Sequence, residues 1–485
     1  MALILAVWNR RFPGVKLNGM TKRLLIPNPK ACCLAINKEN VVMSKLNHVG
    51  GAQTRRQFLA KSSVLAGASV AGALDLSRSA HAAGSDLIKI GLVGCGGRGS
   101  GSIANALSVN PGARLYAMAD AFADRLEGAR SQLQQKFSAQ VDVAGRCFSG
   151  LDAARKLIES GVQVALLTQP PHFRPMHLEA CVEAGVHVFA EKPMAVDAPG
   201  VRRVLAAGEK ARQKKLSFVS GFQTRYSPRA REEVKRVQGG EIGDLVAIEG
   251  VYNTGPLWHR GRQPEWTEME FQVRNWYYFT WLSGDHLVEQ HVHFLDFVGW
   301  LMREEPPLQA WGYGGRSQRV EAKFGDIFDH HSVVYEYANG PRVYALTRQQ
   351  SGCFNGVYAT VFGTKGQLRR GGNARQSGIY TNQGELKWQA PVETEMPEVN
   401  RYREMFAAMQ AGTPINDSLS MARSTMVAIL GRMATHSGQR ITWEQAFASN
   451  KVLAPDRYDW AANPPVMPRA DGTYPHPVPG VTQVL

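Results

Sequence analysis

A run of glycines near residue 95 has the spacing of a phosphate-binding turn. Gly94, Gly96 and Gly99 form a G-x-G-x-x-G pattern, with Gly97 and Arg98 inside it. The first glycine allows a tight turn, the second lets the backbone approach a pyrophosphate, and the third allows close packing of a helix on a strand. The N-terminus of the following helix offers N–H donors to an anion. We expect this turn to bind a dinucleotide, the alternative being glycines that only turn the chain.

An acidic side chain follows at the distance that a dinucleotide requires. Asp120 comes 21 residues after Gly99 and directly after the predicted strand Arg114–Ala119. A carboxylate there could accept hydrogen bonds from both hydroxyls of the adenosine ribose, and its charge would repel a 2′-phosphate. The sequence therefore predicts NAD rather than NADP, although Arg125 could soften this preference. The alternative is that Asp120 only caps a helix.

Two further polar turns come directly after predicted strands. Their residues are Thr168, Gln169, Pro170, Pro171 and His172 in the first turn, and Glu191, Lys192 and Pro193 in the second. Ligands of an open α/β sheet lie beyond the carboxyl ends of its strands, so both turns should face the same crevice as the glycines. The Lys192 ammonium could donate to a substrate hydroxyl and stabilise alkoxide character there. A solvated lysine paired with Glu191 is the alternative.

The elements around these turns predict an α/β fold with two domains. Short apolar runs alternate with helical stretches up to residue 220, which favours a parallel sheet covered by helices on both faces. The predicted strands are Ile88–Val93, Arg114–Ala119, Gln163–Leu167, Val186–Ala190 and Ser217–Ser220, and the predicted helices are Ser100–Leu107, Leu151–Glu159, Met176–Ala184 and Ala198–Lys214. This is the pattern of a Rossmann dinucleotide-binding domain.

After Pro228 the pattern changes to longer β-prone segments, which predict an α+β domain with an open, mostly antiparallel sheet. The predicted strands are Leu245–Tyr252, His331–Tyr337, Arg342–Gln349 and Ala359–Phe362, and the predicted helices are Asp285–Met302 and Arg401–Gln410. We expect a Rossmann domain at 84–220, an α+β domain for substrate binding and oligomerisation at 221–455, and a Pro-rich arm at 456–485.

The net charge of +15 is concentrated near the N-terminus. Residues 1–82 hold 12 of the 56 Lys and Arg residues and 2 of the 41 Asp and Glu residues, which leaves 44 basic and 39 acidic residues elsewhere, a net charge of +5. A nucleic-acid-binding surface across the body of the protein is therefore not expected.

The first 83 residues carry the pattern of an export signal. Thr54-Arg55-Arg56-Gln57-Phe58-Leu59 precedes a short apolar run, Ser62–Leu74, and the small-residue stretch Ala80-His81-Ala82. Paired arginines before Phe-Leu favour the twin-arginine route, and an apolar run this short does not span a bilayer. We expect a periplasmic or otherwise exported protein with no membrane segment after cleavage, and a translation start at Met43. The alternative is an amphipathic or membrane anchor helix.

The order of the glycine turn, Asp120, the Pro170-Pro171 turn and Glu191-Lys192-Pro193 resembles the Gfo/Idh/MocA oxidoreductases. That family also has a DxGxHxxD motif opening a helix in its second domain, and the corresponding segment here runs from Glu289 to Asp296. His293 and Asp296 match the motif, whereas Glu289 replaces its first aspartate and His291 its glycine. The resemblance implies that Lys192 and His293 form the catalytic pair beside the nicotinamide.

Helical periodicity gives a separate argument for His293. At 100° per residue, His286, Glu289, His293 and Asp296 share one face of a helix, and His291 points away from it. Glu289, one turn before His293, could orient its ring or raise its basicity for general-base catalysis. A buried histidine without a chemical role is the alternative. A zinc site is another alternative, formed by His286, Glu289 and His293 with His330 and His331; we expect no metal, because such a site needs closer convergence of its ligands.

The second domain offers side chains that suit a sugar. Aromatic rings stack on the apolar faces of polyol rings, and guanidinium and amide groups bind their hydroxyl edges. The candidate substrate-binding residues are Gln223, Arg225, Tyr226, Trp276 and Asp296, and Trp258 and Arg260 form a similar cluster. Each cluster taken alone could equally belong to the core or to an interface.

Together these features predict an exported NAD-dependent oxidoreductase that removes hydride from a ring-hydroxyl carbon of a sugar. An exported enzyme would need to retain and recycle its cofactor, because the periplasm has no evident nicotinamide pool. The alternatives are an NAD-dependent glycoside-cleaving enzyme of the same fold and a non-catalytic carbohydrate-binding protein with a degenerate Rossmann domain. The resemblance also implies a homodimer or homotetramer formed through the open sheet.

Overall fold

The computed structural model describes residues 87–338, 340–371 and 377–485. The expected export signal, the expected start at Met43 and the boundary at residue 83 lie outside the described residues.

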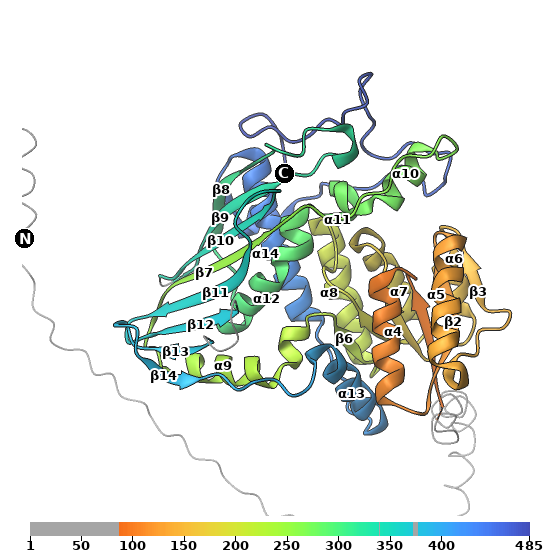
Figure 1. Cartoon of the computed structure of the whole chain (residues 1–485), viewed down its shortest axis with the longest axis horizontal. Coiled ribbons are helices and arrows are strands. Elements are labelled where there is room, and N and C mark those ends of the chain that lie inside the picture. The colour runs from red at the N-terminus through yellow and green to blue at the C-terminus, as the bar shows by residue number, and fades with distance from the viewer. Residues whose placement is uncertain (1–86, 339, 372–376) are drawn as a thin grey trace, which may run out of the picture. The chain divides into compact units, whose positions relative to one another are not determined.

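Six parallel strands form the first sheet, in the order β3-β2-β1-β4-β5-β6 (Figure 1). The strands are β1 (Ile88–Val93), β2 (Ala113–Asp120), β3 (Cys147–Ser149), β4 (Val164–Leu167), β5 (His187–Ala190) and β6 (Phe218–Ser220). The helices between them are α4 (Gly97–Val109), α5 (Ala123–Lys136), α6 (Ala153–Glu159), α7 (Arg174–Glu183) and α8 (Ala198–Gln213). Strand β4 is buried along its whole length, as expected for a sheet covered on both faces. The strand order reverses at β1, so the crevice for a ligand lies beyond the ends of β1 and β4.

Nine strands form the second sheet, in the order β14-β13-β12-β11-β7-β10-β9-β8-β15. They are β7 (Leu245–Thr254), β8 (Gln309–Gly315), β9 (His330–Glu336), β10 (Arg342–Gln349), β11 (Gly356–Gly363), β12 (Gln367–Gly371), β13 (Gly378–Tyr380), β14 (Leu386–Gln389) and β15 (Ile441–Thr442). Strands β7 and β10 pair in parallel, and the other described pairs are antiparallel. The predicted fold class, a Rossmann domain plus a mostly antiparallel α+β domain, is confirmed.

The helices that follow the first sheet are α9 (Pro228–Gln238), α10 (Glu268–Arg274), α11 (Thr280–Ser283), α12 (Val292–Leu301), α13 (Pro397–Gln410), α14 (Ser418–Ser437) and α15 (Trp443–Ala448). They cover one face of the second sheet, chiefly α12 and α14, or pack beside the first domain, as α13 does on α4 (Figure 1). Helix α14 contacts α12, β8 and also α8 of the Rossmann domain. A single apolar core therefore runs from α8 through α14 to the second sheet.

The predicted helix Asp285–Met302 is two different elements. Residues Leu287–His291 form a π-helical turn, η5, and α12 begins at Val292. A π-helical turn contains more residues per turn than an α-helix, so side chains before and after it no longer follow a 100° repeat. Glu289 and His293 nevertheless line the same cavity, whereas Asp296 is bonded to Arg225, so the expectation of one shared face is corrected for Asp296.

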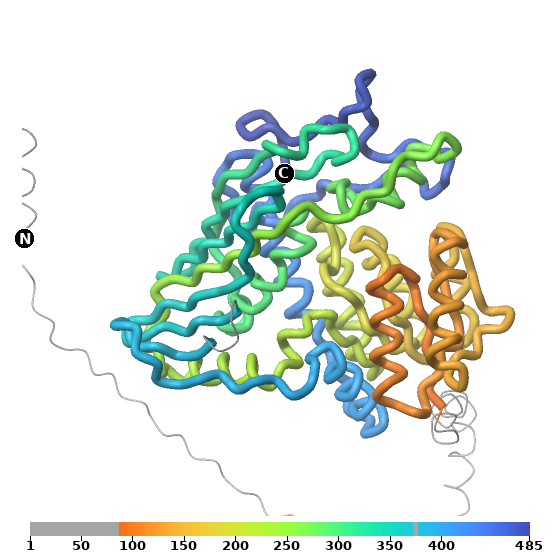
Figure 2. Tube along the Cα trace, in the orientation of Figure 1, coloured from red at the N-terminus to blue at the C-terminus, as the bar shows by residue number. Residues whose placement is uncertain are grey.

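The last residues cross the molecule without regular structure. After α15, residues 449–485 form neither helix nor strand. The Val466 carbonyl accepts a hydrogen bond from Gln272 of α10, 2.7 Å long, and Figure 2 shows the dark blue C-terminal segment beside the green α10 region. We call residues 449–485 the C-terminal arm.

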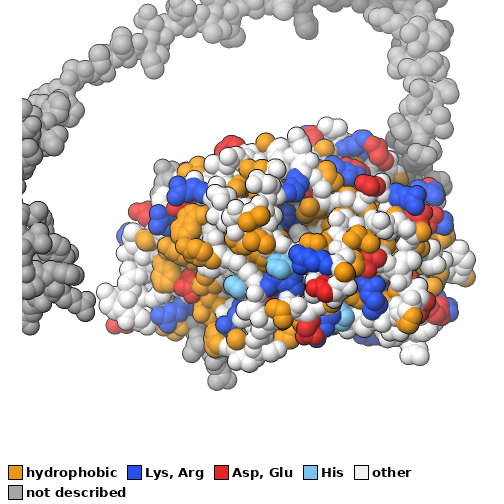
Figure 3. Space-filling view, turned by 90° about the horizontal axis from the view of Figure 1, so that it is seen from above, with side chains coloured by type: hydrophobic (Ala, Val, Ile, Leu, Met, Phe, Trp, Pro, Cys, Tyr) orange, Lys and Arg blue, Asp and Glu red, His pale blue; other side chains and the backbone are white. Residues whose placement is uncertain are grey.

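Basic and acidic side chains are interspersed with apolar ones on the face drawn in Figure 3. Within the described residues, no helix combines the length and the apolarity that a membrane span requires.

Candidate active site

A cavity of about 450 Å³ lies beyond the carboxyl ends of β1, β2 and β4. The glycine turn, Asp120 and Thr168 line it from the Rossmann domain. Trp258, Arg260, Arg274 and Trp276 line it from the second domain. It lies where the strand order reverses, the place at which doubly wound sheets bind ligands.

The glycine turn fits a dinucleotide. Gly94 has φ +92°, and a Cβ there would lie 2.7 Å from the Gln169 nitrogen. A Cβ on Gly99 would lie 1.8 Å from the Gly94 carbonyl oxygen, so only glycine allows this close packing of helix and turn. At Gly96, by contrast, a Cβ would meet nothing within 4 Å, so the backbone borders open space in the cavity. Open space over a helix N-terminus is where a pyrophosphate would lie.

Asp120 is fixed at the end of β2 by two backbone donors. Its Oδ2 accepts from the Cys95 N–H at 2.6 Å, and its Oδ1 accepts from the Phe122 N–H at 2.9 Å. Burial raises the pKa of this carboxyl, and the two backbone hydrogen bonds oppose that shift. A carboxylate oxygen has more than one acceptor position, so both oxygens can still accept from ribose hydroxyls.

A second cavity of about 210 Å³ adjoins the first. Arg98, Thr168, Gln169 and Trp276 line both cavities. Further residues that line the second cavity are Glu191, Lys192, Tyr252, Glu289, Gln290 and His293. The structure therefore brings Lys192 and His293, 101 positions apart in the sequence, to one cavity at the end of the dinucleotide cleft.

Lys192 is buried, and its ammonium is hydrogen-bonded to Glu289 of the η5 turn. Its Nζ donates to the Glu289 carbonyl oxygen at 2.6 Å and to Glu289 Oε1 at 2.8 Å. The side chain is 8% exposed. The peptide bond between Lys192 and Pro193 is cis. The expected alternative partner, Glu191, instead lies 3.3 Å from the buried Arg401.

His293 is the neutral imidazole at neutral pH, with one ring nitrogen protonated and the other carrying a lone pair. Burial lowers the pKa of its imidazole well below the usual value, and the charge of Lys192 lowers it further. Among the described residues, none forms a hydrogen bond with its ring nitrogens, and Phe222 packs edge-on against the ring at 5.9 Å. A neutral imidazole with free nitrogens in a cavity can accept a proton from a bound ligand.

The role expected for Glu289 is corrected by these contacts. Glu289 was expected to orient His293 or raise its basicity, but it is paired with Lys192, and the pKa of His293 is lowered. Glu289 lies within the η5 turn, where both its carbonyl and its carboxylate accept from Lys192. Glu289 therefore positions the ammonium.

Several predicted substrate-binding residues contact each other instead of a cavity. Arg225 Nε donates to Asp296 at 2.9 and 3.0 Å, and its Nη1 donates to Glu304 at 2.8 Å. Tyr226 donates to Asp417 Oδ2 at 2.6 Å. These side chains join elements of the second domain. Neither they nor Gln223 lines either cavity, whereas Trp276 lines both.

His172 also lies outside both cavities. Its Nε2 lies 2.8 Å from the Tyr458 hydroxyl of the C-terminal arm, and burial lowers the pKa of the imidazole to about 3. The neighbouring prolines do line the site, Pro170 in the first cavity and Pro171 in the second.

Two buried arginines behind the site have no signal in the sequence. Arg174 donates to the carbonyl oxygens of Gln169 and Pro193, so it ties the two polar turns together. Arg401 donates to Gly221 at 3.0 Å and to Glu191 at 3.3 Å. An arginine in a helix is usually solvated, and only the packed structure shows these two to be buried.

The site and the fold together define a dinucleotide-binding α/β protein with a second domain over the reactive end of the cleft. Two family models agree with this. The first, the oxidoreductase family with NAD-binding Rossmann fold, matches residues 88–219, and the second, the C-terminal alpha/beta domain of that family, matches residues 234–422. The chain belongs to the Gfo/Idh/MocA oxidoreductase family.

Similar proteins include inositol dehydrogenases. Inositol 2-dehydrogenase 1 of Saccharopolyspora erythraea is 27% identical over 42% of this chain and 57% of its own length. Inositol 2-dehydrogenase of Rhizobium meliloti is 25% identical over 66% of this chain and 86% of its own length. The chain thus spans a little over half the length of the first relative. The aldose-aldose oxidoreductase of Caulobacter crescentus shares the fold, with a TM-score of 0.56 and 15% identity over 73% of this chain and 99% of that structure.

Proposed function

We propose that this protein is an NAD-dependent oxidoreductase that oxidises a ring-hydroxyl carbon of a sugar or cyclic polyol. One observation carries the proposal: a buried ammonium and a neutral imidazole, Lys192 and His293, line the cavity in which the dinucleotide cleft ends. Hydride transfer from an alcohol needs both a base for the hydroxyl proton and a cation for the developing oxyanion. Similarity to inositol dehydrogenases supports a polyhydroxylated ring as substrate.

Each residue has one role in this proposal. His293 accepts the hydroxyl proton, and Lys192 donates a hydrogen bond to the same oxygen. The carbon that bears the oxygen loses its hydrogen with two electrons and becomes a carbonyl carbon. NAD, when bound, supplies the acceptor of that hydride at nicotinamide C4.

The first experiment removes the two groups separately. Lys192→Met and His293→Asn should each lower kcat by about 10²- to 10⁴-fold, the usual contribution of a general acid or base. Lys235→Met, at an 81% exposed position on α9, is the matched control and should change neither kcat nor NAD affinity. The measurements are the absorbance of reduced cofactor over a panel of sugars and cyclitols, and NAD binding by fluorescence. Near-normal turnover in both variants contradicts the assignment, and a wild-type protein that binds sugars without reducing NAD is a carbohydrate-binding protein.

We further propose that the protein is exported by the twin-arginine route and keeps its NAD bound. The C-terminal arm supports retention, because it packs against a residue that lines the first cavity beside Asp120. Trp460 of the arm stacks on Phe122, which lines that cavity, with ring centroids 5.3 Å apart. Arg274 of α10 lies over the same Phe122 ring at 3.9 Å and forms an ion pair with Asp124 at 3.2 Å.

A retained cofactor requires a closed redox cycle. The enzyme would oxidise one sugar and reduce another, or oxidise a glycoside transiently so that a C–O bond cleaves, and then reduce the product. Denaturing the purified protein should release about one dinucleotide per chain, and sugar pairs or glycosides should be converted without added NAD. Conversion of a sugar pair to one oxidised and one reduced sugar indicates the first cycle, and cleavage of a glycoside indicates the second. Absolute dependence on added NAD would contradict retention.

We propose that the exposed face of the second sheet forms a homo-oligomer interface. Large apolar side chains lie exposed on the same face of three of its strands; they are Tyr313 on β8, Tyr344 on β10 and Phe362 on β11. Exposed apolar side chains gathered on one sheet face are typical of an interface. Light scattering after size exclusion should give a dimer or tetramer, and a monomeric mass at micromolar concentration would contradict this proposal.

A further inference from the structure

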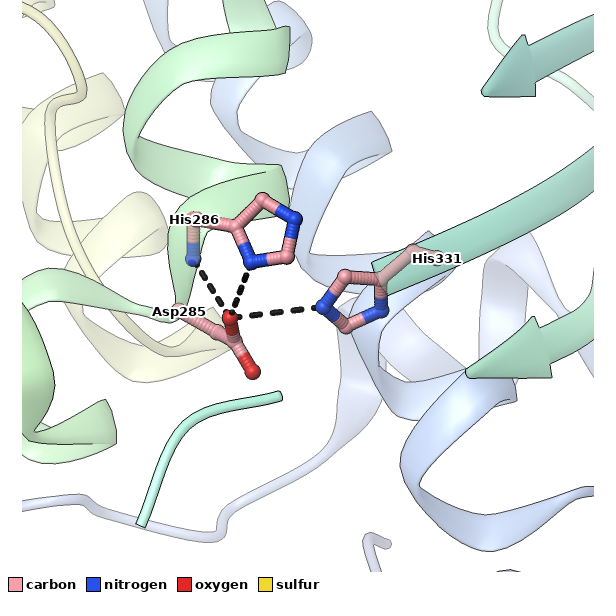
Figure 4. Close-up of side chains that lie close together, drawn as sticks. All are labelled: Asp285, His286 and His331. Atoms are coloured by element: carbon pink, nitrogen blue, oxygen red, sulfur yellow. Dashed lines mark hydrogen bonds and ion pairs between the residues drawn. The ribbon is translucent and has the colours of Figure 1, made fainter. Parts of the chain in front are cut away.

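Three potential metal ligands meet in the interior of the second domain, away from both cavities. Asp285 and His286 precede the η5 turn, and His331 lies on β9. All three are at most 2% exposed. Figure 4 shows a nitrogen of each imidazole turned toward the same carboxylate oxygen of Asp285. One potential ligand atom from each residue lies within 4.8 Å of the others.

The distances match a common coordination centre. Asp285 Oδ1 lies 3.0 Å from His286 Nδ1 and 3.3 Å from His331 Nε2. Ligands bonded at about 2.0–2.2 Å to a tetrahedral ion are about 3.4 Å apart. Asp285 Oδ2 is held separately, by the Phe328 N–H at 3.0 Å and by His436 Nε2 at 2.9 Å. Asp285 Oδ1 accepts from the His286 backbone N–H at 2.5 Å and also faces the two imidazoles.

The hydrogen bonds around His331 leave its Nε2 lone pair without a donor. His331 Nδ1 lies 2.9 Å from Thr435 Oγ1, and that hydroxyl lies 3.2 and 3.1 Å from two helix carbonyl oxygens, which take its one proton. Thr435 therefore accepts from His331 Nδ1–H, and Nε2 presents a lone pair to a carboxylate oxygen. Nε2 is buried, and within the described part of the chain it has no partner in hydrogen-bond geometry. The lone pair of His331 Nε2 and the Asp285 Oδ1 oxygen repel each other, and a proton or a metal ion between them removes this repulsion.

The surrounding charges permit a divalent ion. Acidic and basic side chains balance around the cluster; they are Asp285, Asp326 and Asp329 against Arg316, Arg319 and Arg432. Arg319 and Arg432 donate to the Phe328 and Val196 carbonyl oxygens at 2.5 and 2.7 Å, and the Phe328 oxygen also lies 3.2 Å from His286 Nδ1. His436, whose Nε2 lies 2.9 Å from Asp285 Oδ2, also lines a separate cavity of about 210 Å³.

We propose that Asp285, His286 and His331 bind one divalent transition-metal ion of the zinc class. Two imidazoles and a carboxylate are borderline ligands that suit Zn²⁺ or Co²⁺, with water completing the coordination. Thr435 and His436 of α14 act on the ligands from the second coordination sphere, as partners of metal-bound groups do. The ion would fasten the start of the η5 turn to β9 and α14, and so fix the segment that carries Glu289 and His293. The zinc alternative considered from the sequence included His286 and His331 but not Asp285, and of its other ligands Glu289 and His293 line the other cavity.

The test measures metal directly. Full-length protein, purified without chelator and analysed by mass spectrometry of metals, should contain about one Zn²⁺ per chain. After extraction with a strong chelator, one equivalent of Co²⁺ should restore binding and produce the visible d–d bands of a tetrahedral site. His331→Gln should lose this metal, whereas His330→Gln, a half-exposed neighbour on the same strand, should retain it.

Three results would overturn the proposal. The first is wild-type protein that contains no stoichiometric metal and takes up no Co²⁺, which would show that a proton occupies the site. The second is equal metal content in the His331 and His330 variants. The third is Co²⁺ without tetrahedral bands. The wild-type measurements decide the question even when His331→Gln fails to fold, and none of them depends on the proposed oxidoreductase activity.

Discussion

Lys192 enters the cavity with two of its three N–H donors already used. The Glu289 carbonyl and carboxylate accept these two hydrogen bonds, and no third acceptor lies near the ammonium among the described residues. An ammonium has three donors and no acceptor, so one N–H remains for a ligand oxygen. The pairing also fixes the direction of that donor before any ligand binds. Preorganised donors cost no rearrangement when charge develops on the oxygen.

The protonation of His293 makes a prediction about pH. A general base must be neutral, and the pKa of this imidazole lies below the usual histidine value because of burial and the charges of Lys192 and Arg98. Turnover should therefore persist below about pH 6.5 and fall only as pH drops through the lowered pKa. Removing a positive charge stabilises the imidazolium and raises this pKa. In Arg98→Gln the acidic limb of kcat/KM should move to higher pH.

The control for this shift is an arginine in the first cavity alone. Arg125→Gln removes a charge that lines the first cavity but does not line the second. Its pH profile should keep the wild-type acidic limb, even where the affinity for NAD changes. Identical limbs in wild type and Arg98→Gln would contradict His293 as the titrating base.

Among the elements, the ion pair of Arg225 with Asp296 joins the short 3₁₀ helix η3 (Gln223–Tyr226) to α12. Asp296 is fully buried, and Ser424 of α14 donates to it at 2.9 Å. Removing one partner of a buried pair leaves an uncompensated charge, which costs about 3–5 kcal/mol. Arg225→Gln should lower the free energy of unfolding by that amount in urea titrations, and the folded fraction should keep the wild-type KM for sugar.

An exposed pair gives the matched control for Arg225. Arg231 pairs with Glu404 at 2.9 Å and is 46% exposed. Arg231→Gln should cost no more than about 1 kcal/mol, because solvent screens exposed pairs. A raised KM with unchanged stability in Arg225→Gln would restore the substrate-binding role that the sequence suggested.

The elements also show where sequence reasoning succeeds and fails. The strands around the glycine turn have strongly apolar runs, and these were predicted to within a few residues. The η5 turn could not be predicted, since a π-helical turn has the same composition as an α-helix and differs only in its packing. Strand β8 was missed because three of its seven residues are glycine, which lowers strand propensity.

The C-terminal arm makes a prediction about cofactor retention. Trp460 contacts Phe122 of the first cavity, and an aromatic pair contributes about 0.5–1.5 kcal/mol beyond the area it buries. Trp460→Ala should therefore raise the NAD dissociation rate by roughly 2- to 12-fold. Cofactor retained after gel filtration gives the measurement. Val481→Ala, at a 70% exposed position on the same arm, should retain wild-type NAD, and equal retention in both variants would contradict a role for Trp460.

At the scale of the whole molecule, the site depends on contacts between distant segments. Glu289 and Lys192 are 97 positions apart, and Tyr458 and His172 are 286 apart. The glycine turn, Asp120 and Lys192 were predictable, because each belongs to one strand and its following turn. Partners such as Arg174, Arg401 and Trp460 were not predictable, because nothing local separates a buried arginine or tryptophan from an exposed one.

Buried histidines distributed through the molecule make it sensitive to acid. Burial lowers the pKa of His172 to about 3, of His177 to about 4 and of His291 to about 3. Within the described residues, His177 Nδ1 and both ring nitrogens of His291 have no hydrogen-bond partner that could stabilise a charge. These histidines are neutral in the folded protein and protonated in the unfolded chain below about pH 6.5. The unfolded state therefore binds more protons, and folding stability falls as pH drops from about 6.5 toward 4.

The contribution of one such histidine can be measured in isolation. At pH 5 a histidine held neutral costs about 2 kcal/mol of stability relative to pH 7. His177→Gln removes one protonation site, so the loss of unfolding free energy between pH 7 and pH 5 should shrink by about that amount. Urea titrations of wild type, His177→Gln and the half-exposed control His330→Gln over this range give the comparison. The same pH slope in wild type and His177→Gln would show that the folded protein protonates His177 without cost.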